Sequence, residues 1–401
     1  MASPVDLADW ADVTPLPQLE APDAPFAIAY NARYSLVYGY VRALQASGER
    51  SARALQLTAE AADLNPAHYS VWSLRRQCLD ALLPPAEGGA PGAAGGGAWG
   101  LPQELAWLAA LMRRKGCWKN YQVWHHRRLV VERLGDGSLE MGLTSEAFED
   151  CPKNYHAWSH RQWAVRTLTG DGGGGGAAGA GAPPLGSWQA ELAFAGALLA
   201  EDVRNNSAWN HRWFVLTRGG GAPRALPRAR WPAPADLARE VAFCAAALRP
   251  VRRNEAAWSH LRACVLLARV QGAAAAAAAA DAAQGAAPDS PPAPPASTGC
   301  MEDLRRAPAG LGWGAWPEVL ALARECQAGG SSSAEAGDGG CAGEATATAA
   351  ASYNAAACEV LGEHAEASGD GAGAVLHYAR AGEGDAIRAQ YWKWREGQVE
   401  G

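Results

Sequence analysis

Residues 119–128 read KNYQVWHHRR and residues 153–162 read KNYHAWSHRQ, so one motif occurs twice at a spacing of 34 positions. The lysine, asparagine, tyrosine and tryptophan keep their relative places, as does the histidine–arginine pair that follows. Weaker copies surround Trp72, Trp209 and Trp258. A repeat of this length is typical of stacked supersecondary units, each of which contacts only its neighbours. The motif therefore decides how the rest of the chain is interpreted.

The repeat tryptophans measure the period of the array. The intervals are 52, 34, 51 and 49 residues between Trp72, Trp124, Trp158, Trp209 and Trp258. Each long interval contains a stretch rich in glycine, proline and alanine, at residues 84–100, 170–186 and 219–235. Removing these inserts leaves a unit of about 34 residues, present in five clear copies. The inserts contain too few large apolar residues to offset the entropy of ordering, so we expect them to be disordered.

Each copy has the pattern of two helices joined by a turn. Leucines spaced by three or four residues over 101–111 mark one apolar face of a first helix. The second helix begins at Asn120, a favoured N-cap residue, and has two apolar stripes, as expected for an inner helix covered on both sides. The same plan recurs at 139–150 with 154–168, 188–202 with 205–217, and 236–248 with 254–270. These patterns predict an all-α fold, a right-handed superhelical array (an α-solenoid) of helical hairpins.

Composition and periodicity divide the chain into six segments. We expect an irregular N-terminal arm at residues 1–25, with Trp10 and residues 15–17 as docking points. The repeat array then covers residues 26–270. It is followed by a low-complexity linker at 271–299, a helical segment at 300–326, a second linker at 327–350 and a C-terminal helical segment at 351–401.

Composition also limits the class of protein. The net charge of −6 and the pI near 5.9 do not favour a nucleic acid or an anionic membrane surface as partner. The nine cysteines are scattered and form no C-x-x-C pair, which argues against a disulfide framework and a structural zinc site. The N-terminus lacks a secretory signal, and the alanine run at 273–280 is too short and too weakly apolar to span a bilayer. The expectation is a soluble protein of the reducing cytoplasm.

Charged and polar residues gather at the start of the inner helices. Lys119 and Lys153 each precede a helix N-terminus, where unpaired N–H groups and the helix dipole favour an anion. Tyr121, Tyr155 and His156 add hydrogen-bond donors. This set suits a diphosphate, or its stabilisation as a leaving group. The alternative is a solvated surface charge, because arginine takes the same place in two other copies.

The other motif residues are interpreted as structural. Packing explains the tryptophans, and carboxylates or helix C-termini are the expected partners of Arg127, Arg161 and Arg212. One histidine per copy is too widely spaced to share a metal, so internal hydrogen bonds are favoured for His126, His160, His211 and His260. The sequence contains no Asp-rich magnesium motif, P-loop, G-x-S-x-G motif or clustered catalytic zinc ligands. An anion site without a nucleophile or metal indicates half of an active site.

These motifs resemble those of protein prenyltransferase α subunits, in particular the α subunit shared by protein farnesyltransferase and geranylgeranyltransferase type I. The resemblance covers most of the chain outside the inserts, including residues 10–18, 49–58, 119–128, 153–163, 201–210 and 387–392. It implies a crescent of helical hairpins that forms a heterodimer with a farnesyltransferase or geranylgeranyltransferase I β subunit. The implied reaction joins a prenyl diphosphate to the cysteine of C-a-a-X-tail proteins such as small GTPases.

The resemblance also implies residue roles. Lys119 would be the catalytic contact to the diphosphate, and Gln122 would bind the terminal carboxylate of the C-a-a-X tail. The substrate-binding set would be Lys119, Tyr121, Gln122, Asn154, Tyr155 and His156. Zinc would be held by the β subunit and Mg²⁺ would accompany the diphosphate, so this chain alone would bind no metal.

Two other readings remain open at this stage. One is the α subunit of the geranylgeranyltransferase that modifies Rab proteins, although residues 10–18 and 49–58 favour the first reading. The other is a non-catalytic scaffold of the tetratricopeptide type, which would need no lysine or glutamine at the helix N-termini. The fifth copy has Leu261 where the others have arginine, so we expect its packing to differ.

Overall fold

A computed structural model describes residues 10–19, 28–83, 99–114, 117–168, 188–217, 232–283, 317–327 and 354–400. Almost all of the three inserts and most of the two predicted linkers lie outside these residues. Every regular element among the described residues is a helix, which confirms the all-α prediction. The chain folds into two compact units, Met1–Ser187 and Trp188–Gly401.

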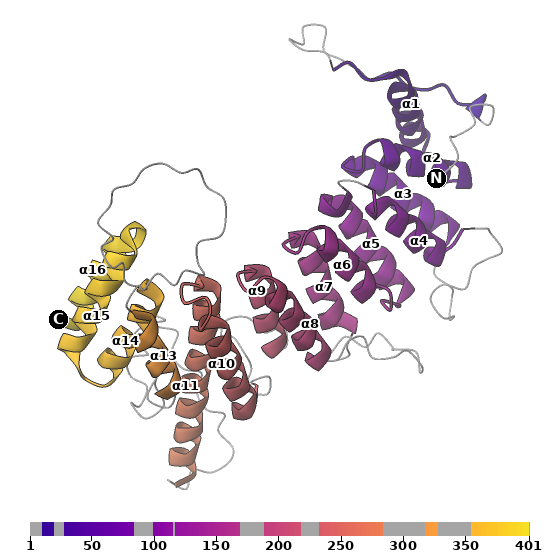
Figure 1. Cartoon of the computed structure of the whole chain (residues 1–401). Coiled ribbons are helices and arrows are strands. Elements are labelled where there is room, and N and C mark those ends of the chain that lie inside the picture. The colour runs from indigo at the N-terminus through magenta and orange to yellow at the C-terminus, as the bar shows by residue number, and fades with distance from the viewer. Residues whose placement is uncertain are drawn as a thin grey trace. The chain divides into compact units, whose positions relative to one another are not determined.

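The first unit consists of a single helix followed by three helical hairpins (Figure 1). The single helix is α1 (Ala32–Ser47). The hairpins are α2 (Ala52–Leu64) with α3 (Tyr69–Leu82), α4 (Leu101–Met112) with α5 (Tyr121–Leu134), and α6 (Glu140–Asp150) with α7 (Tyr155–Leu168). A short 3-10 helix, η2 (Cys117–Lys119), leads into α5. The second helices pack on one another in chain order, α3 on α5 and α5 on α7, as the repeat predicts.

The second unit continues the same plan with four hairpins (Figure 1). These are α8 (Trp188–Glu201) with α9 (Asn206–Leu216), α10 (Pro234–Leu248) with α11 (Glu255–Ala283), α13 (Pro317–Gln327) with α14 (Ala355–Ala367), and α15 (Gly371–Gly384) with α16 (Ala389–Glu400). The 3-10 helix η6 (Ala386–Arg388) precedes α16. Within this unit α9 packs on α11 and α11 on α14. Tyr378 and Trp392 form the buried centre of the last hairpin.

The five repeat tryptophans are buried, each no more than 5% exposed, which confirms their predicted packing role. Each indole Nε1–H also donates a hydrogen bond to the backbone carbonyl six residues earlier, at 2.8 or 2.9 Å. The donor and acceptor pairs are Trp72 and Pro66, Trp124 and Trp118, Trp158 and Pro152, Trp209 and Val203, and Trp258 and Arg252. The tryptophan therefore fixes the turn between the two helices of its hairpin as well as filling the core.

The N-terminal arm docks on the first unit where the sequence predicts. Trp10 is 2% exposed, and the Arg53 guanidinium lies 4.9 Å from the centre of its ring. The Leu16 N–H donates to the Gly39 carbonyl at 3.1 Å. Glycine allows this close approach, because a Cβ at position 39 would lie 3.0 Å from Cβ of Pro15. The arm is thus held by both its aromatic ring and its backbone.

Helix α11 extends to Ala283, past its predicted end at residue 270 and into the predicted linker. Alanine is the strongest helix former, so the run at 273–280 prolongs the helix that the repeat begins. Among the described residues, α11 alone is long and apolar enough to cross a membrane, by length and composition only. Its first half is a repeat helix with Trp258 and Cys264 buried, and its second half is mostly alanine.

Helix α14 lies in the predicted C-terminal helical segment, but the sequence analysis did not identify it as a sixth copy of the inner helix. Asn354 caps α14 through its side chain, as Asn205 caps α9. The tryptophan position of this copy is occupied by Cys358, which is fully buried. Without a tryptophan, this copy lacks the residue that marks the other five. The preceding copy also differs as expected, because Arg262, next to Leu261, forms ion pairs with two glutamates of α14.

Candidate functional site

Buried arginine–glutamate–histidine networks join successive hairpins. Glu104 of α4 accepts both guanidinium hydrogen bonds from Arg75 at 2.6 Å and lies 2.9 Å from Nε2 of His126. Glu140 in the next hairpin pairs with Arg127 and His160, and Glu240 pairs with Arg212 and His260. His211 bonds to Glu191 at 2.9 Å. The predicted internal roles are confirmed for the four histidines and for Arg127 and Arg212.

Burial and charge set the protonation of these networks. Burial raises the pKa of Glu104, but Arg75 and His126 outweigh it and lower that pKa to about 2. Burial lowers the pKa of His126, although Glu104 opposes the change. Glu104 is therefore ionised and His126 is neutral in the folded protein at neutral pH. The network is a structural ion pair completed by a neutral imidazole.

The stability of the chain should fall as pH drops below about 6.5. An unfolded histidine gains a proton there, whereas folded His126 resists it, so protonation favours the unfolded chain. The stabilisation from Glu104 is complete above the unfolded pKa near 4.5 and is lost as pH falls toward the folded value of about 2. Both effects lower the urea midpoint, which circular dichroism would measure at a series of pH values. A midpoint that stays constant between neutral pH and pH about 4 would contradict these assignments.

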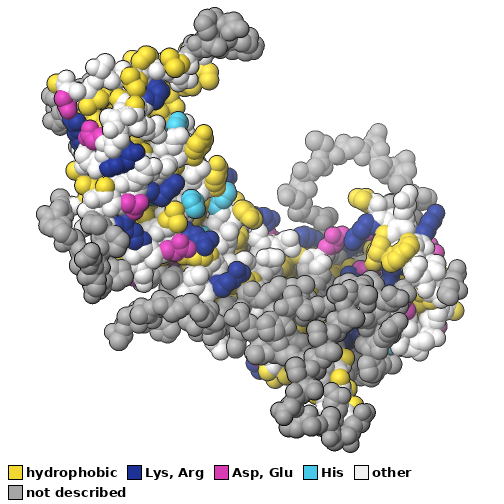
Figure 2. Space-filling view, turned by 180° about the vertical axis from the view of Figure 1, so that it is seen from behind, with side chains coloured by type: hydrophobic (Ala, Val, Ile, Leu, Met, Phe, Trp, Pro, Cys, Tyr) yellow, Lys and Arg dark blue, Asp and Glu magenta, His cyan; other side chains and the backbone are white. Residues whose placement is uncertain are grey.

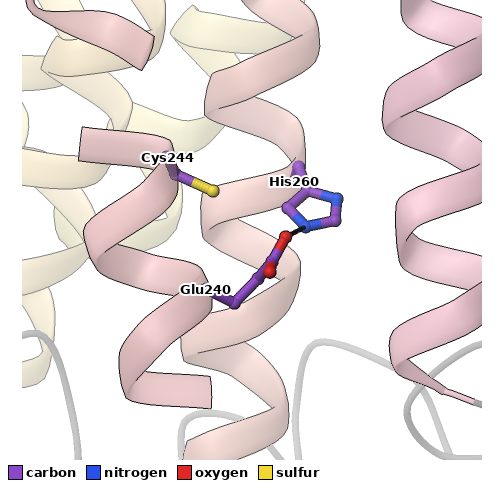
Figure 3. A group of neighbouring side chains, drawn as sticks. All are labelled: Glu240, Cys244 and His260. Atoms are coloured by element: carbon purple, nitrogen blue, oxygen red, sulfur yellow. Dashed lines mark hydrogen bonds and ion pairs between the residues drawn. The ribbon is translucent and has the colours of Figure 1, made fainter. Parts of the chain in front are cut away.

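One network includes a cysteine and has the donor atoms of a metal site. Candidate ligand atoms of Glu240, Cys244 and His260 lie within 4.8 Å of one another, all buried between α10 and α11 (Figure 3). However, Arg212 binds both carboxylate oxygens of Glu240, and His260 bonds to one of them. The same arrangement occurs around Glu104, where Leu108 replaces the cysteine. The hydrogen-bonded network of the repeat therefore accounts for this cluster.

Lys119 stands at an exposed helix start, as the sequence predicts. It is the last residue of η2, and Asn120 caps α5 by accepting the N–H of Gln122 at 3.0 Å. Lys119 is exposed and forms no hydrogen bond or ion pair with any residue that the structure describes. Its ammonium group is thus available to an anion at the positive end of the α5 dipole.

The second part of the predicted set lies at the start of α7. Tyr155 is 76% exposed. Its ring meets the imidazole of the half-buried His156 edge to face, with 5.6 Å between the ring centroids. Tyr121 is 60% exposed at the matching position of α5, where Gln122 is half-buried. These side chains have room to meet a ligand from outside the chain.

Asn154 differs from the other five predicted residues. Only 4% of it is exposed, and its Nδ2 donates to the Trp118 carbonyl at 2.8 Å. Its Oδ1 accepts the N–H groups of His156 and Ala157 at 3.0 and 3.3 Å. The bond to Trp118 brings the two parts together, because it joins the residue before Lys119 to the residue before Tyr155.

The exposed face of α5 carries two further side chains that sequence reasoning missed. His125 and Arg128 follow Tyr121 at helical spacing on that face. Partial burial and the nearby guanidiniums of Arg76 and Arg128 lower the pKa of His125. Figure 2 shows histidine side chains beside basic ones on the first unit, at the upper left. His125 lies four residues after Tyr121 and Arg128 three residues after His125, and this helical spacing would have predicted that the three side chains share one face. His125 is therefore neutral at neutral pH, and Arg128 pairs with Glu132, so the unpaired positive charge beside this face is that of Lys119.

Comparison with known proteins identifies the repeat. Residues 51–82, 101–134, 138–168 and 188–219 match the family described as protein prenyltransferase alpha subunit repeat. A protein farnesyltransferase/geranylgeranyltransferase type-1 subunit alpha from Pisum sativum is 36% identical over 210 residues, which are 52% of this chain and 54% of the relative. A geranylgeranyl transferase type-2 subunit alpha from Bos taurus is 27% identical over 194 residues, 46% of this chain and 29% of the relative. The match thus spans about half the length of the pea relative.

A solved structure shares the fold. It is Candida albicans protein geranylgeranyltransferase-I complexed with GGPP, with a TM-score of 0.61 and 19% identity over 99% of each chain. The helical hairpins, the four matched repeats and this likeness agree with one another. Four segments of this chain therefore match the protein prenyltransferase alpha subunit repeat, and the helical hairpins that they form agree with that match.

Proposed function

We propose that this chain is the α subunit of a heterodimeric protein prenyltransferase of the farnesyltransferase and geranylgeranyltransferase type I kind. With a β subunit, it would transfer a farnesyl or geranylgeranyl group from the diphosphate to the cysteine of a C-terminal C-a-a-X motif, forming a thioether. The name of the pea relative supports this class. One observation carries the proposal. Lys119 is exposed, and the hydrogen bond from Asn154 to the Trp118 carbonyl joins its backbone to the start of α7, where Tyr155 and His156 lie.

The roles of the residues follow from the charge that the reaction moves. As the substrate thiolate attacks C1 of the prenyl group, negative charge builds on the departing diphosphate. Lys119 stabilises that charge, and the hydroxyl groups of Tyr121 and Tyr155 add donors. The Gln122 amide would bind the terminal carboxylate of the peptide substrate, and His156 would face the same site. The ammonium group of Lys119, at the positive end of the α5 dipole, attracts the anionic diphosphate.

The metals of the reaction lie outside this chain in our proposal. Zinc held by the β subunit would stabilise the substrate cysteine as a thiolate, and Mg²⁺ would accompany the diphosphate as part of the substrate. Among the described residues, the Glu240–Cys244–His260 cluster does not fit a catalytic zinc, because Arg212 holds the carboxylate and the whole cluster is buried. A catalytic zinc also needs an open coordination position. We place the assembled enzyme in the cytoplasm.

Co-expression with candidate β subunits tests the proposal. The chain is expressed separately with the β subunits of farnesyltransferase, geranylgeranyltransferase type I and Rab geranylgeranyltransferase, and the complexes are isolated through a tag on the β subunit. We expect stable one-to-one complexes with the first two. Assembly only with the Rab-type β subunit would favour the type-2 α subunit instead. Assembly with none of them would favour a non-catalytic scaffold.

A further inference from the structure

We infer that Asn154 is a positioning residue, which holds Lys119 in register with Tyr155 and His156 and does not itself touch substrate. The inference rests on the proposed function and changes the role that the family resemblance implies for this residue. Burial is the first reason, because only 4% of Asn154 is exposed. Hydrogen bonding is the second reason. The side-chain oxygen of Asn154 accepts a backbone N–H at the N-terminal end of α7, and its amide nitrogen donates to a backbone carbonyl in η2.

The Trp118 carbonyl is the centre of the arrangement. It accepts the Asn154 amide at 2.8 Å and the Trp124 indole N–H at 2.9 Å, so both of its lone pairs are used. Trp118 itself is 8% exposed. This carbonyl belongs to the peptide group that leads directly into Lys119. The backbone beneath the lysine is therefore fixed from α5 and from α7, while the lysine side chain is exposed.

The same asparagine links two copies of the repeat. Its Oδ1 accepts the backbone N–H of His156, which sets the first turn of α7 and hence the positions of Tyr155 and His156. The Asn154 side chain thus connects the peptide group before Lys119 to the N-terminal end of α7, which carries Tyr155 and His156. A contact of this kind sets the distance between catalytic and binding groups, and errors near 1 Å in such distances can cost on the order of 10²-fold in rate.

The second unit contains the same hydrogen bonds without the functional side chains. The Asn254 amide donates to the Val203 carbonyl at 2.7 Å, and that carbonyl also accepts the Trp209 indole. The residue after Val203 is Arg204, and the residue after Asn254 is Glu255. The contribution of the asparagine-to-carbonyl hydrogen bond to the stability of the chain should therefore be similar for Asn154 and Asn254. Only at Asn154 does it also position Lys119.

Serine variants separate the two roles. Serine at position 154 keeps a capping oxygen for α7 but is too short to reach the Trp118 carbonyl. The experiment compares Asn154→Ser with Asn254→Ser in the heterodimer, by single-turnover prenyl transfer at saturating substrates. We expect Asn154→Ser to slow the reaction by about tenfold or more, and Asn254→Ser to leave the rate within about twofold of wild type. In Asn154→Ser the steady-state KM values should change less than the single-turnover rate.

Hydrogen exchange gives a second readout that does not need activity. The Asn120 N–H donates to the Cys117 carbonyl, and the Asn205 N–H donates to the Asp202 carbonyl. We expect faster exchange at Asn120 in the first variant and at Asn205 in the second. A wild-type rate in Asn154→Ser, or equal slowing in both variants, would overturn the inference. An inactive wild-type heterodimer would refute the proposed function, and unchanged exchange at Asn120 would still refute the positioning.

Discussion

Replacing Lys119 by alanine should slow prenyl transfer by on the order of 10²–10³-fold while the heterodimer still assembles. The side chain is exposed and unpaired among the described residues, so its removal breaks no contact within the chain. What is lost is a positive charge held where the leaving diphosphate becomes more negative. Because this charge matters most in the transition state, the single-turnover rate should fall more than the affinity for the prenyl diphosphate. Rapid-quench kinetics with a C-a-a-X peptide measures both.

Arg204→Ala is the matched control for this prediction. Arg204 also directly precedes a capping asparagine and is exposed, but it lies at the start of α9. Its removal should leave the rate unchanged. Equal rates for wild type and Lys119→Ala would show that the lysine is only a solvated surface charge, which is the alternative that the sequence leaves open.

Replacing Glu140 by glutamine should destabilise the chain by on the order of 3–5 kcal/mol. Glu140 is fully buried and receives two hydrogen bonds from Arg127 and one contact from His160. The neutral amide leaves the Arg127 guanidinium buried without a counter-charge. Burial raises the pKa of Glu140, but His160 and Arg127 outweigh it and lower that pKa, as expected for a stabilised carboxylate. Urea unfolding followed by circular dichroism measures the loss.

An exposed pair in the same unit provides the comparison. Glu132 pairs with Arg128 one turn away on α5, and both side chains are more than 40% exposed. Glu132→Gln should change stability by less than about 0.5 kcal/mol, because water solvates either partner when the other is lost. Similar losses for Glu132→Gln and Glu140→Gln would mean that the buried network does not hold the hairpins together.

The repeat made most of the fold predictable. Its tryptophans, capping asparagines and leucine spacing mark the helix pairs, and the helices begin and end within a few residues of the predicted positions. The misses have physical causes. Alanine prolonged α11 beyond the repeat. Helix α14 was predicted as a helix but not as a sixth copy of the repeat, because Cys358 fills its tryptophan position with a smaller apolar group.

The hydrogen-bond partners of the histidines and arginines that recur in the repeat were harder to predict. Histidine and arginine appear inside the motif, but the glutamates that bind them lie on other helices. Glu140, Glu191 and Glu240 each precede their histidine by 20 residues, a signal that was present in the sequence. For the site, exposure of Lys119 followed from its place before an N-cap. The burial of Asn154 did not, because its second bond crosses to a different repeat.

Transfer of the prenyl group by the reconstituted heterodimer tests the central claim most directly. The chain is combined with a farnesyltransferase β subunit, a C-a-a-X peptide, farnesyl diphosphate, zinc and Mg²⁺, and the peptide is examined by mass spectrometry. The account predicts a farnesyl thioether on the cysteine that forms only when both subunits are present. A stable complex that yields no product, or a β subunit that is equally active alone, would contradict it.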